Sequence, residues 1–126
     1  LPRLKATTDH CHQLDLPIVT HMCGNIRPLI PDLLDIGIDA MESLQPEAMD
    51  IYALKKACAG KMVLIGGVGM QSIMPFGSDR ELRDEISRLR RELGSGGGYV
   101  LATSKSIMSD ISAERAALYL ELMLAE

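Results

Sequence analysis

The chain has 126 residues, which is enough for one small domain and too few for two. With 47% hydrophobic residues, 24% charged residues and a net charge of −4, the composition is typical of a globular domain, and the interleaving of basic with acidic residues excludes a basic nucleic-acid surface. No apolar run approaches about 18 residues and no signal peptide is recognisable, so neither a membrane span nor secretion is expected. Three cysteines without framework spacing predict reduced thiols and a cytoplasmic location.

Four units of a strand followed by a helix are expected along the chain, after a first helix over 4–14. The strands are expected near 17–21, 38–43, 62–66 and 98–103, and the helices that follow them over 28–36, 46–59, 79–93 and 113–125. Pro28 and Pro46 suit first helical positions, and the sequence over 78–81 is a capping box. Alternating helices and near-continuous apolar strands predict a parallel sheet covered by helices, which is an α/β fold.

Each expected strand ends in polar or glycine-rich sequence, namely His21-Met22-Cys23, Glu42-Ser43, Gly66-Gly67 and Thr103-Ser104-Lys105. In (β/α)8 barrels the chemistry lies at these carboxyl ends of the strands. Four such units are half of a barrel, although they fit a small open sheet nearly as well. We therefore expect residues 1–126 to be a single partial domain, completed by a missing N-terminal half or by self-association. The three residues His10-Cys11-His12 close the first helix and are expected at the opposite rim of the barrel. They therefore predict no metal site.

His21 and Cys23 stand two residues apart where a strand ends, so their side chains are expected on the same side. Imidazole and thiolate are ligands that zinc prefers, although a buried thiol beside a hydrogen-bonded histidine would produce the same pattern. Glu42, at the end of the neighbouring strand, is a candidate third ligand or a solvated rim carboxylate. Gln71 and Ser104 are candidate substrate-binding residues, and the alternative for Gln71 is a solvated loop side chain.

Four stretches resemble the C-terminal half of the uroporphyrinogen decarboxylase superfamily, and they follow one another in the family's order. They are PIVTHMCGN over 17–25, GIDAMESLQP over 37–46, MVLIGGVGMQ over 62–71 and GGGYVLATSKSIMSD over 96–110. The resemblance implies that the chain forms the C-terminal half of a (β/α)8 TIM barrel. The superfamily includes porphyrinogen decarboxylases and methylcobamide:thiol methyltransferases, so the resemblance leaves two chemistries open.

The His21 and Cys23 pair resembles the zinc motif of the methyltransferase branch, in which a second cysteine lies on the last barrel strand. Lys105 stands at that place in this chain, and a protonated lysine does not ligate a metal. The resemblance implies zinc-assisted methyl transfer to a thiol from a corrinoid carried by a partner protein. A zinc ion would keep the incoming thiol deprotonated.

The alternative implied function is decarboxylation of a porphyrinogen-like polycarboxylate, a small-molecule substrate, without a cofactor. In that branch the place of Lys105 resembles an active-site histidine, and the lysine would stabilise developing negative charge as the catalytic residue. A third possibility is a non-catalytic fragment that needs its N-terminal half. The sequence leaves all three open, with methyl transfer as the leading prediction.

Overall fold

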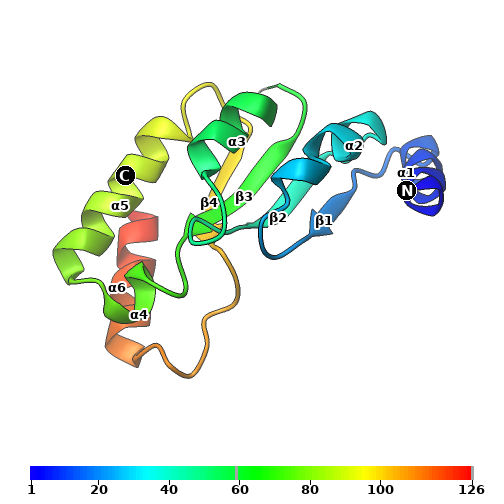
Figure 1. Ribbon diagram of the computed structural model, residues 1–126. Coiled ribbons are helices and arrows are strands. Elements are labelled where there is room, and N and C mark those ends of the chain that lie inside the picture. The colour runs from blue at the N-terminus through cyan, green and yellow to red at the C-terminus, as the bar shows by residue number, and fades with distance from the viewer. Residues whose placement is uncertain (59, 126) are drawn as a thin grey trace.

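The structure is a computed structural model that describes residues 1–58 and 60–125. Its elements in chain order are α1 (Pro2–Gln13), β1 (Val19–His21), the 3-10 helix η1 (Arg27–Leu29), α2 (Ile30–Asp35), β2 (Ala40–Leu44), α3 (Ile51–Cys58), β3 (Val63–Val68), α4 (Ile73–Phe76), α5 (Asp79–Glu92), β4 (Tyr99–Thr103) and α6 (Ala113–Leu124) (Figure 1). The four strands form one parallel sheet in the order β1-β2-β3-β4. The predicted α/β fold is confirmed, and the arrangement is consistent with part of a TIM barrel. Within the described part, no helix is both long and apolar enough to cross a membrane.

Several helix boundaries differ from those expected: the first helix, expected over 4–14, is Pro2–Gln13, and the largest shift is at the start of α3. The helix expected from Pro46 begins instead at Ile51, because the Asp50 carboxylate accepts hydrogen bonds from the backbone N–H groups of Tyr52 and Ala53, at 3.0 and 2.9 Å, and so caps the helix there. The expected end of that helix at residue 59 lies outside the described residues. The helix expected over 28–36 begins as η1, and the short α4 was not expected at all.

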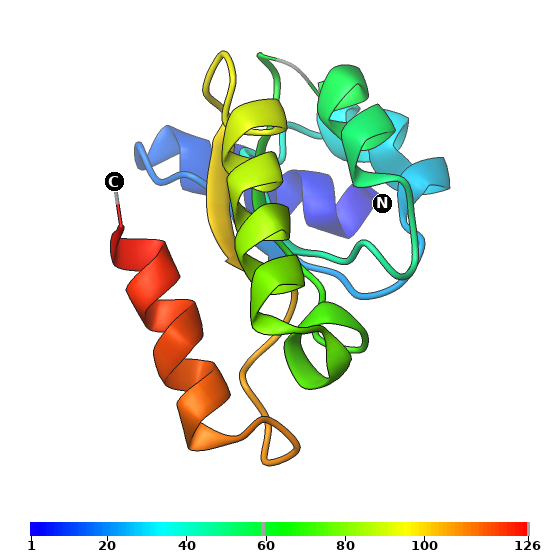
Figure 2. The same ribbon diagram turned by 90° about the vertical axis from the view of Figure 1, so that its left-hand side faces the viewer.

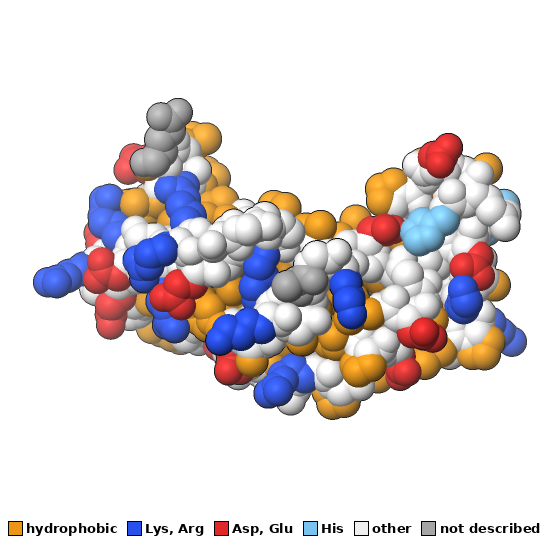
Figure 3. Space-filling view, turned by 90° about the horizontal axis from the view of Figure 1, so that it is seen from above, with side chains coloured by type: hydrophobic (Ala, Val, Ile, Leu, Met, Phe, Trp, Pro, Cys, Tyr) orange, Lys and Arg blue, Asp and Glu red, His pale blue; other side chains and the backbone are white. Residues whose placement is uncertain are grey.

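The two faces of the sheet differ in what covers them. Met41 and Leu64, neighbours across β2 and β3, are fully buried on the face where α3 and α5 pack. Val19 and Val100, on the two outer strands, remain 56% and 49% exposed. The side view places α2 and α3 on one side of the sheet, with α6 set apart on the other (Figure 2). Seen from above, the molecule is hollowed along one side between two arms (Figure 3). An uncovered, curved sheet face accounts for this shape.

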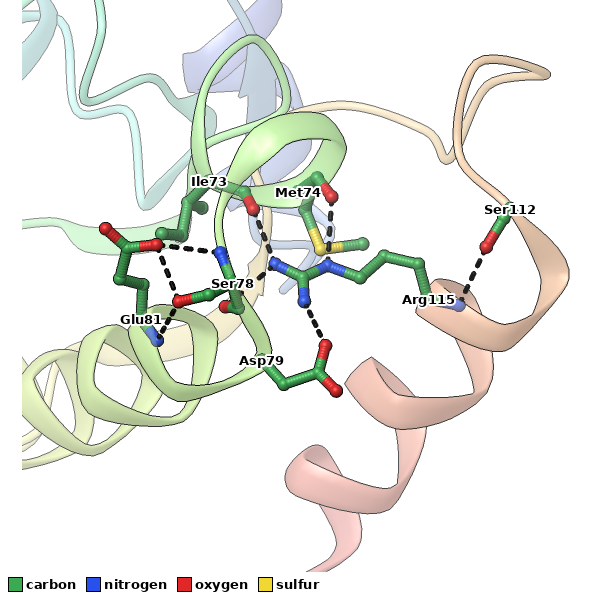
Figure 4. Close-up of polar contacts among 7 residues, drawn as sticks. All are labelled: Ile73, Met74, Ser78, Asp79, Glu81, Ser112 and Arg115. Carbon is green, nitrogen blue, oxygen red and sulfur yellow. Dashed lines mark hydrogen bonds and ion pairs between the residues drawn. The ribbon is translucent and has the colours of Figure 1, made fainter.

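Arg115 on α6 joins that helix to the segment between β3 and α5 (Figure 4). Its guanidinium donates to the carbonyl oxygens of Ile73 and Met74, at 2.7 and 3.0 Å, and to the carboxylate of Asp79 at 2.8 Å. The Arg115 side chain is only 12% exposed. The capping box predicted over 78–81 is present at the start of α5. The guanidinium thus adds a charged donor to two carbonyls of α4, of which that of Ile73 also accepts from the backbone N–H of Gly77 at 3.1 Å.

Arg115→Ala is expected to lower the free energy of unfolding by about 2–3 kcal/mol, because it leaves several carbonyl acceptors without a charged donor. Urea denaturation followed by circular dichroism measures the change. Arg80→Ala is the matched control, since the ion pair of Arg80 with Asp84 has side chains 91% and 73% exposed and is expected to contribute little. Equal losses in the two variants would contradict the stabilising role of Arg115.

The outer strands β1 and β4 each pair on one side only within the described sheet. Unpaired edges and exposed apolar side chains promote association with another chain. We therefore predict that this chain alone does not persist as a monomer. Sedimentation equilibrium at micromolar concentration is expected to show a mass above 13.7 kDa, and Val100→Lys on β4 is expected to reduce the association. A monodisperse, folded monomer would contradict the half-barrel prediction and favour a self-sufficient open sheet.

Candidate functional site

The register of β1 and β2 places His21 directly beside Glu42 at the carboxyl ends of both strands. Nδ1 of His21 lies 3.3 Å from Oε2 of Glu42, and Nε2 lies 3.3 Å from Sγ of Cys23. The imidazole therefore stands between a carboxylate and a sulfur, with one ring nitrogen facing each. This row of three side chains is the centre of the candidate site.

The carboxylate determines which nitrogen of His21 carries the proton. A carboxylate accepts hydrogen bonds, so Nδ1–H donates to Glu42, and in the neutral ring Nε2 then presents its lone pair toward Cys23. The hydrogen bond to Cys23 and, after it, the hydrogen bond to Glu42 raise the pKa of His21 above its usual value. The raised pKa favours the charged ring, in which Nε2–H donates to the sulfur of Cys23, whereas a metal would need that nitrogen without its proton.

Cys23 is surrounded by groups that favour its thiolate. Its sulfur lies 3.6 Å from the hydroxyl oxygen of Ser43, and that hydroxyl donates to the carbonyl oxygen of Ser104 at 2.7 Å. The Ser43 hydroxyl, whose hydrogen goes to Ser104, accepts from the Cys23 thiol, whereas the hydrogen bond with His21 and the positive charge of Lys105 lower the pKa of that thiol. The site therefore combines groups that follow β1, β2 and β4.

The backbone at Ser43 is irregular in a way that the neighbouring strand accommodates. The pairing of β2 with β3 shifts register between Glu42 and Leu44, and Leu44 then pairs with Gly66. A Cβ at Gly66 would lie 2.8 Å from the backbone nitrogen of Leu44. Glycine is thus required on β3 for the bulge that turns Ser43 toward the site.

A second network joins the loops that follow β1, β2 and β3. The N–H of Gly24 donates to Oε1 of Gln45, whose Nε2 donates to Oε1 of Gln71, each at 3.2 Å. Glu47 accepts from the backbone N–H of Gln71 at 2.9 Å and from the hydroxyl of Ser72 at 2.8 Å. Because a backbone N–H only donates, the bond from Gly24 identifies Oε1 of Gln45 as an acceptor, so Nε2 of Gln45 donates to Oε1 of Gln71. Gln71 thus takes part in this network through its side-chain oxygen and not through its amide N–H groups.

The structure brings several of the sequence-predicted residues together. His21, Cys23 and Glu42 are in contact, and Lys105 acts on Cys23 through its charge. Ser104 is only 3% exposed and contributes its backbone carbonyl, whereas Gln71 belongs to the second network. Sequence reasoning missed the contributions of Ser43, Gln45 and Glu47. Ser43 and Gln45 follow the polar end of the strand around Glu42, which is the only signal that points to them.

The trio over 10–12 lies at the other end of the sheet. Nε2 of His12 is 2.8 Å from Oδ2 of Asp39, just before β2 begins, and Asp39 also accepts from the N–H of Ile18 at 2.7 Å. His12 thus links α1 to the start of the sheet.

A tetrahedral zinc ion fixes how far apart two of its ligand atoms lie. Nitrogen at about 2.0 Å and sulfur at about 2.3 Å from a tetrahedral ion are about 3.5 Å apart, and the 3.3 Å between Nε2 of His21 and Sγ of Cys23 is close to this value. The pair therefore fits as two adjacent ligands. Among the described residues, no group of three or more His, Cys, Asp and Glu side chains is arranged to hold an ion. Glu42 as a third ligand stays a prediction, and its carboxylate lies on the Nδ1 side of the ring.

The comparison with protein families agrees with the resemblance noted in the sequence. The family model for uroporphyrinogen decarboxylase (URO-D) matches residues 1–124. No curated protein matches the chain. The match covers the sheet, the candidate site and all of α1 to α6, and the chain therefore belongs to the uroporphyrinogen decarboxylase family.

Proposed function

We propose that this chain carries part of a site for zinc-assisted methyl transfer from a corrinoid, held by a partner protein, to a thiol. The observation that supports the proposal is the pair formed by Nε2 of His21 and Sγ of Cys23, 3.3 Å apart, with Nδ1 of the same ring occupied by Glu42. In this arrangement the two donor atoms lie next to each other, on the side of the ring away from Glu42. The identity of the methyl carrier follows only from the resemblance to the methyltransferase branch.

The side chains of this proposal have separate tasks. Glu42 accepts a hydrogen bond from Nδ1–H and so favours the tautomer whose lone pair is on Nε2, as carboxylates do behind many metal-binding histidines. Cys23 supplies the sulfur ligand, and its surroundings lower the pKa of that thiol. When zinc is bound, it supplies a Lewis acid that keeps an incoming thiol deprotonated near neutral pH.

In this proposal the substrate is bound by Lys105 and by Gln71 of the second hydrogen-bond network. The lysine places a positive charge near Cys23, where it attracts an anionic substrate group. Gln71 presents amide donors toward acceptor atoms, since its own oxygen is taken by Gln45. Ser104 contributes by holding the end of β4 through its carbonyl.

Decarboxylation of a porphyrinogen-like polycarboxylate is the second candidate function. The observation that favours it is Lys105, a cation at the position where a third ligand is expected in the methyltransferase branch. In that reaction the lysine binds a carboxylate or stabilises the negative charge left as carbon dioxide departs, and no metal is needed. A non-catalytic role is the remaining alternative.

The metal proposal predicts zinc in the purified chain, measured by elemental analysis. Cys23→Ser is expected to remove most of it, because a zinc–thiolate bond is a main source of affinity. Cys11→Ser is the matched control and is expected to retain the zinc, since Cys11 lies on α1 at the other end of the sheet. Equal metal in the wild type and the Cys23→Ser variant would rule out the assignment.

Lys105→Cys separates the two chemistries. If Lys105 replaces a ligand, the new thiolate is expected to raise zinc affinity in a competition titration with a chelator. If Lys105 serves an anionic substrate, the same change is expected to leave zinc affinity unchanged and to weaken the binding of a polycarboxylate porphyrin. No change in zinc affinity would count against a three-ligand site at these positions.

The surroundings of the cysteines predict an order of alkylation in metal-free protein. The surroundings of Cys23 lower the pKa of its thiol, so its reaction with iodoacetamide is expected to begin at lower pH than that of a free thiol. Burial raises the pKa of Cys58, which is expected to react last. His21→Gln is expected to move the Cys23 midpoint upward. Peptide mass spectrometry over a pH series measures each site, and equal rates for Cys23 and Cys58 would contradict the described surroundings.

A further inference from the structure

Gln71, which follows β3, has a side-chain amide whose orientation is set by a backbone group. The oxygen and the nitrogen of an amide are told apart by their hydrogen-bond partners. The N–H of Gly24 only donates, so the atom of Gln45 that it meets at 3.2 Å is the oxygen. The nitrogen of Gln45 is then the donor, and the atom of Gln71 that it meets at 3.2 Å is again the oxygen. Gly24, Gln45 and Gln71 thus form an amide relay whose direction starts from one backbone N–H.

The backbone of Gln71 is fixed as well, so its side chain starts from a defined place. Its N–H donates to Oε1 of Glu47 at 2.9 Å, and the hydroxyl of Ser72 donates to the same oxygen at 2.8 Å. A Cβ at Gly69 would displace that oxygen, so glycine leaves room for it. Gln45 is half-buried and Gln71 is exposed. Gln71 is therefore the member of the amide relay that a ligand reaches.

We propose that Gln45 is the positioning residue that sets the ligand preference of Gln71, by engaging its amide oxygen so that only N–H donors remain for a substrate. The inference rests on the proposed role of Gln71 in substrate binding and requires no metal. An amide whose oxygen is engaged offers donors alone. The chemical group that it fits is one with acceptor oxygens, above all a carboxylate, whereas an ammonium group, which only donates, is disfavoured.

Two substitutions of Gln45 change the amide relay in different ways. In Gln45→Glu both side-chain oxygens accept, so Gln71 must turn its nitrogen toward the new carboxylate and its oxygen toward the ligand. Gln45→Met keeps a side chain of similar length but removes the hydrogen bonds, so the amide of Gln71 can adopt either orientation. The control is Asn25→Asp, which adds the same charge in the loop next to Gly24 and keeps the acceptor for the N–H of Arg27.

Binding is measured by fluorescence titration with two probes, a porphyrin that carries carboxylates and a porphyrin that carries ammonium groups. The wild type is expected to prefer the carboxylate probe, and Gln71→Ala is expected to weaken its binding. Gln45→Met is expected to reduce the preference about 5-fold and Gln45→Glu about 10-fold, because the first loses an oriented donor and the second replaces it with an acceptor. Asn25→Asp is expected to reduce the preference less than Gln45→Glu, since it adds only charge.

Nuclear magnetic resonance of isotope-labelled protein reads the orientation of the amides without a ligand. The hydrogen-bonded amide proton is expected in Gln45 in the wild type and in Gln71 in the Gln45→Glu variant. A hydrogen-bonded amide proton of Gln71 in the wild type would overturn the inference, and so would equal probe preference in Gln45→Glu and Asn25→Asp.

The probe titrations also separate this inference from the proposed function. Weaker carboxylate binding in Gln71→Ala, with wild-type preference in both Gln45 variants, would overturn the inference and leave the substrate-binding role of Gln71 standing. Unchanged carboxylate binding in Gln71→Ala, or no binding by the wild type, would overturn that role and the inference together.

Discussion

The parallel pairing of β1 with β2 is the interaction on which the candidate site depends. It places His21 opposite Glu42, and Cys23 follows two residues later. Side chains alternate between the faces of a strand, so a slip of one residue would turn His21 toward the helices and separate it from the carboxylate. The register is held by the other face, where Met41 is fully buried among the helices. Packing on the covered face thus determines the chemistry of the open face.

Glycines in β3 make the close approach of its neighbours possible. A Cβ at Gly66 would meet the backbone of Leu44, and one at Gly67 would lie 2.7 Å from the hydroxyl oxygen of Tyr99. That hydroxyl donates to the carbonyl of Gly66 at 2.7 Å, which links β4 to β3 beyond their ladder. The bulge that directs Ser43 toward Cys23 therefore depends on small residues in the strand beside it. Glycines, which have no side-chain functional group, therefore shape the site as much as the residues whose side chains carry one.

The alternation of apolar strands and amphipathic helices was enough to predict the α/β fold. The stripe of α5 is a clear example, since Leu82, Ile86 and Leu89 are buried as their spacing requires. The start of a helix was harder to predict where two nearby residues could each begin it. Pro46 suits a first helical position, but the carboxylate of Asp50 satisfies the free N–H groups of α3 and moves its start.

The site was predictable only where it follows from local strand geometry, and not where it depends on contacts between distant residues. The spacing of His21 and Cys23 follows from strand geometry and needs no tertiary information. The role of Ser43 depends on a positive φ and on a carbonyl 61 residues away, neither of which leaves a local signal. The amide chain through Gln45 and Gln71 likewise depends on three loops meeting at one end of the sheet.

Burial is unequal across the site, and this determines which part of it is rigid. The side chains of His21 and Glu42 are 54% and 55% exposed, and a contact between such exposed groups contributes little restraint. Ser43 and Ser104 are 1% and 3% exposed, and their hydrogen bond is shielded from water. The more restrained part of the site therefore consists of Ser43 on β2 and Ser104 after β4. The imidazole of His21 lies on the outer strand β1 and is less restrained. A strand paired with the outer edge of β1, as the half-barrel prediction requires, would lie beside His21 and is expected to shield its contacts with Glu42 and Cys23 from water.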